Sequence, residues 1–334
     1  MSDCKFGLTA IGNALVDVLS QVDDAFVAEQ ERKHGVKPGT MNLIGEDRAI
    51  QLYGDMTKRT EEAGGSAGNT MAAFASFGGN GAYIGKVAND TVGTLFSQSM
   101  TTQGIHYGTK TLSGGAATGR SMILITPDGQ RTMNTFLGAA VELTPADIDE
   151  DVIANSLVTY LEGYLFDPPQ AKQAFYKAAE IAHKAGRKVS LTLSDPFCVD
   201  RYRAEFRDLI ENHVDILFAN EEEIKSLFQT DSWDDAVKQI ADQCDIVCLT
   251  RSEKGSVILQ GGKTYTIPAE PVAKVVDTTG AGDAYAGGVL FGYAQGLDMA
   301  TCGRLGSIAA AEVISHIGPR PHKKLADLTP RKAA

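Results

Sequence analysis

Cysteine is scarce and scattered in this sequence, with five residues in 334 and no CxxC pair. Cys244 and Cys248 lie four positions apart, but no second pair or run of histidines completes a ligand set. The spacing of a structural zinc site is therefore missing, and an odd number of thiols in a long chain does not suggest a disulfide scaffold. We expect reduced structural thiols and a cytoplasmic location.

Positive charge is also in short supply. The chain has 31 Lys and Arg residues against 42 Asp and Glu residues, a formal net charge of −11. Such an acidic chain repels nucleic-acid backbones and anionic lipid headgroups. The first twenty residues carry Asp3 and Asp17, and glycine interrupts their apolar run, unlike a leader or a membrane span. We expect neither a nucleic-acid nor a membrane partner.

Apolar side chains are plentiful, at 43% of the sequence, and they fall into alternating strand-like and helix-like patterns. Such alternation predicts an α/β fold: a three-layer, doubly wound, mainly parallel sheet with helices on both faces. The predicted strands are residues 6–11, 82–87, 157–161, 189–193, 216–219 and 246–250, with a hairpin at 257–267. The predicted helices are residues 69–77, 92–103, 170–185, 202–211, 221–228, 233–244, 282–296 and 299–315.

One part of the chain lacks this alternation. In residues 105–138, Thr, Ser and Gly interleave with apolar residues around a Pro-Asp-Gly turn, which predicts a β-hairpin. Together with residues 36–44 it would form a small antiparallel sheet, inserted as a lid. We therefore predict an α/β body of residues 1–14, 46–104 and 138–334 and a lid of residues 15–45 and 105–137. The polar residues 319–334 are expected to be a loosely held terminus.

The most informative segment is DTTGAGD, residues 277–283. The small side chains of Gly280, Ala281 and Gly282 let a ligand approach the backbone, and the first turn of the helix that follows exposes unpaired N–H groups. Those groups form an anion site. Asp283 lies at the same helix start, where its charged form is stabilised and can accept a proton. An anion site beside a general base is what phosphoryl transfer to a hydroxyl requires.

Other interpretations of the glycine-rich segments fit less well. The Gly262-Lys263-Thr264 segment lies between two strands and has Val257 where a P-loop has its first glycine. GNGAYI, residues 79–84, lacks the last glycine of a dinucleotide fingerprint and precedes a strand. A hydride-transfer enzyme is therefore a weak alternative. Asp283 taken alone also fits an ordinary acidic residue in the first turn of a helix.

The segment 277–283 resembles the C-terminal signature of the ribokinase-like family of carbohydrate and nucleoside kinases. GGSAGN, residues 64–69, is similar to the family's N-terminal signature, with Met71 where a small residue is usual. NEEE, residues 220–223, resembles its Asn-x-x-Glu element, and the motifs follow in the family's order. The resemblance implies that Asp283 is the catalytic base and that the backbone of residues 280–282 forms the anion site.

The same resemblance implies contacts with ATP and Mg²⁺. Glu223 would hold Mg²⁺ indirectly, through water, although Asn220 and Glu223 also fit a helix capping box. LTRSEKG, residues 249–255, resembles the turn that contacts ATP phosphates, with Ser252 in place of the usual glycine. The turn at Asp277 resembles the place where relatives bind K⁺. The implied nucleotide-binding residues are Asn220, Thr250, Ser252, Gly255, Thr279, Gly280 and Gly282.

A second group of polar residues suits the hydroxyl-bearing substrate. A carboxylate such as Asp17 accepts hydrogen bonds from two vicinal hydroxyls at once, although Asp17 also fits a turn and Asn69 a helix cap. GNALVD, residues 12–17, resembles the adenosine kinase branch of the family. Phe166 and Phe197 could stack on a purine, or could belong to the core. The predicted substrate-binding residues are Asn13, Asp17, Gly64, Gly65, Asn69, Phe166 and Phe197.

These observations predict a MgATP-dependent kinase that transfers the γ-phosphate to a primary hydroxyl, with the 5′-hydroxyl of adenosine as the leading acceptor. A sugar kinase acting on ribose, fructose or a related polyol is the alternative within the same chemistry. A nucleoside-binding protein without turnover is a further alternative, but it would have no use for a base beside an anion site. The resemblance leaves a monomer and a homodimer equally open.

Overall fold

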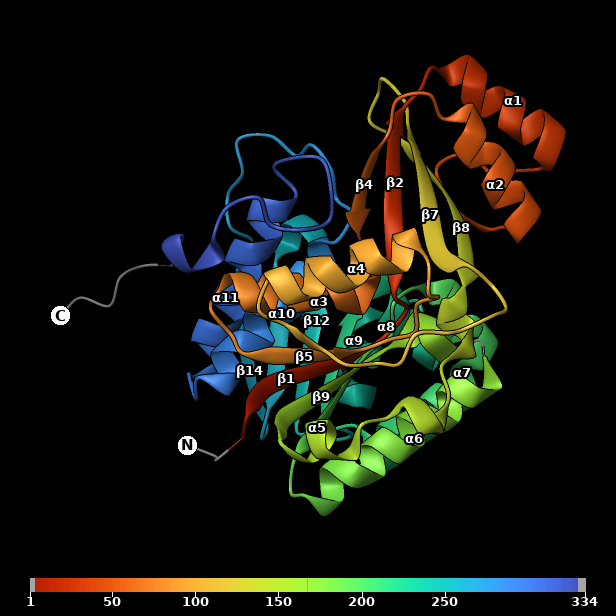
Figure 1. The fold of residues 1–334 in the computed structure, drawn as a ribbon. Helices are drawn as coiled ribbons and strands as arrows, with labels where there is room; N and C mark the ends of the chain where they lie inside the picture. Colours follow the sequence, from red (N-terminus) through yellow and green to blue (C-terminus); the bar gives the residue numbers. More distant parts are fainter. Residues whose placement is uncertain (1–3, 167, 330–334) are drawn as a thin grey trace.

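The computed structural model describes residues 4–166 and 168–329 (Figure 1). Its main sheet has nine strands in the order β14-β13-β12-β11-β10-β9-β1-β5-β6. Neighbours from β12 to β6 pair in parallel, and β13 and β14 add an antiparallel hairpin at one edge. These strands are β1 (Phe6–Ile11), β5 (Gly81–Ile84), β6 (His106–Tyr107), β9 (Ser156–Glu162), β10 (Lys188–Thr192), β11 (Ile216–Asn220), β12 (Ile246–Thr250), β13 (Ser256–Gln260) and β14 (Lys263–Ile267).

Helices cover both faces of the main sheet, so the body has three layers (Figure 1). One face carries α3 (Ser66–Ser76), α4 (Thr91–Thr102), α10 (Ala281–Ala294) and α11 (Met299–Val313). The other carries α5 (Glu150–Ala154), α6 (Pro169–Lys184), α7 (Pro196–His213), α8 (Glu221–Phe228) and α9 (Trp233–Ile240). The predicted doubly wound α/β fold is confirmed.

The central strands are apolar on both sides because both sides are buried. In β11, Leu217 packs into the cluster beneath α6 to α9, while Phe218 packs into the cluster beneath α3 and α10. Successive side chains of a strand point to opposite faces, so a strand covered twice is a continuous apolar run. This pattern is what made these strands predictable.

A second, five-stranded sheet forms the lid and stands beside the body, with the order β3-β8-β7-β2-β4 (Figure 1). Two of its pairs, β2 with β7 and β3 with β8, are parallel, so the sheet is mixed rather than antiparallel as predicted. Its strands are β2 (Leu15–Gln21), β3 (Met41–Leu43), β4 (Thr60–Ala63), β7 (Thr118–Ile125) and β8 (Arg131–Gly138).

The lid takes in more of the chain than the predicted residues 15–45 and 105–137. Helices α1 (Asp24–His34) and α2 (Glu46–Asp55) contribute Val27, Ala49 and Leu52 to the lid's own apolar cluster. Strand β4 pairs with β2, so residues 46–63 belong with the lid and not with the body. Strand β6 pairs with β5 in the main sheet, so residues 106–107 belong with the body. Strand pairing between distant segments decides these boundaries.

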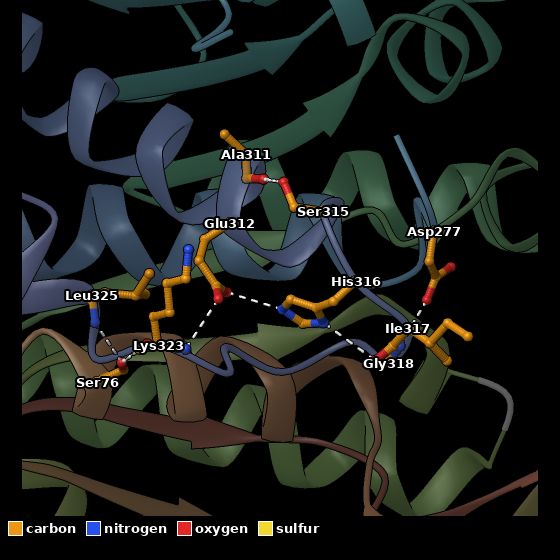
Figure 2. Close-up of polar contacts among 10 residues, drawn as sticks. All are labelled: Ser76, Asp277, Ala311, Glu312, Ser315, His316, Ile317, Gly318, Lys323 and Leu325. Atoms are coloured by element: carbon orange, nitrogen blue, oxygen red, sulfur yellow. Dashed lines mark hydrogen bonds and ion pairs between the residues drawn. The ribbon is translucent and has the colours of Figure 1, made fainter. Parts of the chain in front are cut away.

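Residues 314–325, which we call the C-terminal strap, are tied to the body by several polar contacts (Figure 2). Glu312 accepts from the amide of Lys323 at 3.0 Å and lies 3.1 Å from Nε2 of His316. The amide of Leu325 donates to Oγ of Ser76 in α3 at 2.9 Å. The part of the predicted loose terminus before residue 330 is therefore held in place, and residues 330–334 lie outside the described residues.

Within the described residues, no helix is both long enough and apolar enough to cross a membrane.

Candidate active site

Asp283 lies where the starts of two helices meet. In α10 it is the third residue, and its Oδ1 accepts from Oγ of Ser66 at 2.6 Å while its Oδ2 accepts from Nδ2 of Asn69 at 3.1 Å. Both partners belong to α3. The N-cap of α10 is Gly280 rather than Asp283, so the carboxylate bonds to another helix instead of capping its own. Asp283 is thus an acidic residue in the first turn of α10, as the sequence also suggested, and its carboxylate in addition bonds to the neighbouring helix.

The glycine loop before α3 brings the substrate residues together. A Cβ on Gly64 would lie 2.3 Å from the carboxylate of Asp17, and one on Gly65, which has a φ of 80°, would lie 2.2 Å from the carbonyl oxygen of Asn13. A side chain at either position would push the lid strand β2 away from α3. The structure thus gathers five of the predicted residues: Asn13, Asp17, Gly64, Gly65 and Asn69.

The free backbone N–H groups at the start of α10 differ from the predicted set of residues 280–282. Gly280 has a left-handed φ of 76°, and a Cβ there would lie 2.6 Å from the carbonyl oxygen of Pro319 in the strap. Among the described residues the amides of Gly280, Gly282 and Asp283 have no acceptor, but the amide of Ala281 donates to the carbonyl of Thr278 at 3.3 Å. Ala281 therefore contributes its small size and not a free N–H group.

Asp277 is buried in a network that joins body, lid and strap. Its Oδ1 accepts from the amide of Thr279 at 3.0 Å, and its Oδ2 accepts from the amide of Gly318 at 2.9 Å (Figure 2). Arg131 at the start of β8 adds an ion pair at 2.5 Å. Three donors therefore already meet the Asp277 carboxylate, and K⁺ at this residue stays a prediction.

The predicted nucleotide residues line the carboxyl ends of adjacent strands. Asn220 ends β11 directly opposite Thr250, which ends β12. Asn220 and Glu223 form the capping box of α8, with the Glu223 amide donating to Asn220 Oδ1 at 2.8 Å. Ser252 has a φ of 50°, the left-handed conformation that favours glycine. The residue is a serine, but its backbone keeps the shape that the family's glycine would give.

Gly255 supports the turn of the nucleotide segment. Its φ is 81°, and a Cβ there would lie 2.1 Å from the carbonyl oxygen of Ile267. It permits the β12–β13 connection to close against β14. Its role in nucleotide binding stays a prediction.

Comparison with known proteins agrees with this geometry. A family model described as pfkB family carbohydrate kinase matches residues 43–324. The chain belongs to the pfkB family. The predicted fold, the ATP-dependent kinase class and the likeness to the adenosine kinase branch are thereby confirmed.

Relatives and solved structures match nearly the whole chain of this pfkB protein. Adenosine kinase of Saccharomyces cerevisiae is 27% identical, over 95% of this chain and 98% of the yeast protein. The crystal structure of adenosine kinase from Sinorhizobium meliloti is 50% identical, covers 97% of this chain and 98% of its own, and has a TM-score of 0.91. A probable sugar kinase from Rhizobium etli CFN 42 is 49% identical with the same coverage and TM-score.

Arg320 is a site residue that the sequence motifs did not reveal. It reaches from the strap to α3, where Nε donates to Oδ1 of Asn69 at 3.1 Å and Nη2 to the carbonyl of Gly64 at 3.3 Å. The bond to Asn69 fixes that amide so that its nitrogen faces Asp283. Arg320 lies in a polar stretch without periodicity, and only tertiary packing brings it to the site.

Glu162 at the end of β9 was also missed as a site residue. It is 1% exposed and bonds to Nδ2 of Asn13 at 2.7 Å and to the amide of Ala67 at 2.8 Å. An acidic residue that directly follows a buried strand was the available signal, because the carboxyl ends of parallel strands form the ligand-binding edge.

Phe166 is not in the site, contrary to the prediction. It is fully buried in the core, stacked on Phe206 with ring centroids 4.4 Å apart. Phe197 is 74% exposed at the start of α7 and therefore remains free to meet a ligand. An aromatic side chain that follows a strand can point into the core or toward the ligand-binding edge, and the sequence does not decide between them.

Burial raises the pKa of four carboxyl groups of the site. The pKa rises to about 7 for Asp17, Glu162 and Glu223 and to about 6 for Asp283. For Asp283, the bonds from Ser66 and Asn69 and the charge of Arg320 oppose the effect of burial. Four carboxyl groups thus titrate close to neutral pH, where a general base is most useful.

We expect Phe166→Ala to lower the free energy of unfolding by about 3–5 kcal/mol, because it removes a buried ring and leaves a cavity. Phe197→Ala should change it by less than about 0.5 kcal/mol. Denaturant unfolding of both variants measures this, and equal effects would contradict the core position of Phe166.

The free energy of unfolding should rise by more than about 1 kcal/mol as the pH falls from 8 to 5.5. The folded state holds protons on these carboxyl groups up to pH 6–7, whereas the unfolded chain releases them near pH 4. Folding therefore binds protons in this window, and the stabilisation is lost as the pH rises. Asp17→Asn should reduce the slope and Asp242→Asn, at an exposed position, should not. Stability that falls on acidification to 5.5 would contradict the assignment.

Proposed function

We propose that this pfkB protein phosphorylates adenosine, transferring the γ-phosphate of MgATP to the 5′-hydroxyl. The observation that carries the proposal is the half-buried carboxylate of Asp283, held by α3 beside free amides at the start of α10. A base beside an anion site serves transfer to a hydroxyl, because the acceptor must lose a proton while negative charge grows on the phosphoryl oxygens.

Each group of the site has a role in this reaction. Asp283 accepts the proton of the hydroxyl as its oxygen attacks phosphorus. The free amides of Gly282 and Asp283, with the positive end of the α10 dipole, stabilise the transferred phosphoryl group. Arg131 adds positive charge from the lid, since its Nη1 is buried without a partner among the described residues.

Recognition of the acceptor rests on Asp17 and its neighbours. Burial, with the charge of Glu62, raises the pKa of Asp17 to about 7. Two hydroxyl donors would stabilise its charged form, so a vicinal diol such as that of ribose suits it. The likeness to adenosine kinases of Sinorhizobium meliloti and Saccharomyces cerevisiae favours a nucleoside as the carrier of that diol.

ATP and Mg²⁺ fit the residues at the nucleotide side. The free amides at the start of α10 suit phosphate oxygens, and the buried Glu223 carboxylate suits a hydrated cation. Mg²⁺, when bound, neutralises phosphate charge. K⁺ at Asp277 stays a prediction, and no step is assigned to that ion. A monomer or homodimer in the cytoplasm stays a prediction.

A sugar kinase is the second candidate. The family's description as carbohydrate kinases and the likeness to a probable sugar kinase of Rhizobium etli favour it. Both candidates use the same base and anion site. They differ in the part of the acceptor beyond the hydroxyls at Asp17, which is a purine base in adenosine and is missing in a sugar.

Asp283→Asn should lower kcat by about two to four orders of magnitude with little change in the KM for ATP, because it removes proton acceptance alone. Asp242→Asn, at an exposed position far from any motif, is the matched control. A kcat near that of the wild type would remove Asp283 as the base.

Release of ADP at fixed MgATP should be fastest with adenosine among adenosine, inosine, ribose and fructose, and AMP should be the product. Asp17→Ala should raise the KM for adenosine by roughly 100-fold or more while leaving the KM for ATP nearly unchanged. Faster turnover of ribose or fructose would establish the sugar kinase instead, and binding of adenosine without ADP release would establish a nucleoside-binding protein.

A further inference from the structure

The carboxylate of Glu162 lies against Gly12, where the backbone carries no side chain. A Cβ on Gly12 would lie 2.3 Å from Oε2 of Glu162 and 2.6 Å from Cβ of Ala67, so Gly12 leaves room for this carboxylate and for the start of α3. The side chain joins the β1–β2 turn to the start of α3 through Asn13 and Ala67. Burying a carboxylate is costly unless every oxygen is bonded, and here each oxygen has an N–H donor.

The consequence of this bond falls on Asn13. Both Asn13 and Glu162 are 1% exposed. Nδ2 of Asn13 donates to Glu162, and while Glu162 is charged the amide cannot exchange its nitrogen and oxygen without facing that carboxylate with a second acceptor. Its Oδ1 is then left buried, and it has no partner among the described residues.

A buried acceptor without a partner is rare in folded proteins and calls for an explanation. Asn13 lies next to the glycine loop that also contacts Asp17, since its carbonyl oxygen limits the space at Gly65. An acceptor at this place is satisfied when an incoming molecule donates a hydrogen bond to it. Hydroxyl groups do so, whereas ether oxygens, carbonyl groups and fluorine do not.

We propose that Glu162 is a positioning residue that locks Asn13 with its oxygen, and never its nitrogen, turned toward the acceptor substrate. This subsite therefore selects a group that donates a hydrogen bond, which in a ribose-bearing acceptor is a hydroxyl. The inference rests on the proposed function for the identity of the molecule, a ribose-bearing nucleoside, and goes beyond it by assigning the sense of one hydrogen bond and the residue that sets it.

A single isosteric substitution, Glu162→Gln, should turn the Asn13 amide around. In Glu162→Gln the amide oxygen stays with the fixed N–H of Ala67, so the new NH₂ group faces Asn13. Two NH₂ groups cannot bond to each other, so Asn13 turns its oxygen to the new amide and its nitrogen to the substrate. The KM for adenosine should rise roughly 10- to 100-fold while kcat changes less than about threefold, because the lost bond is made equally in ground and transition states.

The reciprocal substitution should restore binding. In Asn13→Asp combined with Glu162→Gln, one oxygen of the new carboxylate accepts from the new amide and the other is again an acceptor for the substrate. The KM for adenosine should return to within about fivefold of the wild type. Asn13→Asp alone sets two carboxylates against each other and should be the weakest binder of the set. Glu211→Gln, at an exposed position, is the matched control.

A purely structural role for Glu162 predicts different results. It would give an unchanged KM in Glu162→Gln, or loss of kcat and thermal stability together without rescue by Asn13→Asp, and either result would overturn the proposal.

The Asp17→Ala variant gives an independent test if the Glu162 and Asn13 variants do not fold, because Asp17 then no longer accepts from the ribose hydroxyls. In Asp17→Ala, at least one of the 2′-fluoro and 3′-fluoro deoxyadenosines should still bind roughly tenfold or more weakly than adenosine, because fluorine cannot donate to Asn13. Binding of both as tightly as adenosine would overturn the proposal. If the wild type does not turn over adenosine at all, the proposed function has failed first, and the same variants are then measured with the sugar that the ADP-release screen identifies.

Discussion

The site depends on holding several carboxylates out of water within one small region. Asp17, Glu162 and Asp283 come from β2, β9 and α10, and each is raised in pKa by burial. Donors meet the oxygens of two of these groups: the side chains of Ser66 and Asn69 bond to Asp283, and the side chain of Asn13 and the amide of Ala67 bond to Glu162. The glycines at 12, 64 and 65 follow from the same constraint, because they clear space for these groups.

The strap and the lid complete this arrangement from outside the parallel sheet. Arg320 orients Asn69, Pro319 limits the conformation of Gly280, and Gly318 and Arg131 both engage Asp277. The C-terminal strap is therefore part of the site. Such long-range contacts give the start of α10 a fixed geometry before any ligand binds, which is the preorganisation that electrostatic catalysis requires.

The sequence predicted those features that local pattern controls. The limits of α8 agree with the prediction of residues 221–228, and both glycine loops precede helices as expected. Helix α1 was missed because only Val27 and Gln30 of its eleven residues are buried, so it has almost no apolar stripe, although Asp23 and Gly35 were readable caps. Phe166, Arg320 and the pairing of β4 depend on contacts between distant segments, which spacing along the chain does not encode.

The proposed reaction requires that a partly buried Asp283 takes the proton from the acceptor hydroxyl. The pH dependence of kcat/KM for the phosphoryl acceptor tests it most directly, because this ratio reports the free protein. We expect an acid limb with its midpoint between pH 6 and 7, where Asp283 and Asp17 titrate. A rate that stays constant down to about pH 4, the ordinary range of an aspartate, would contradict it.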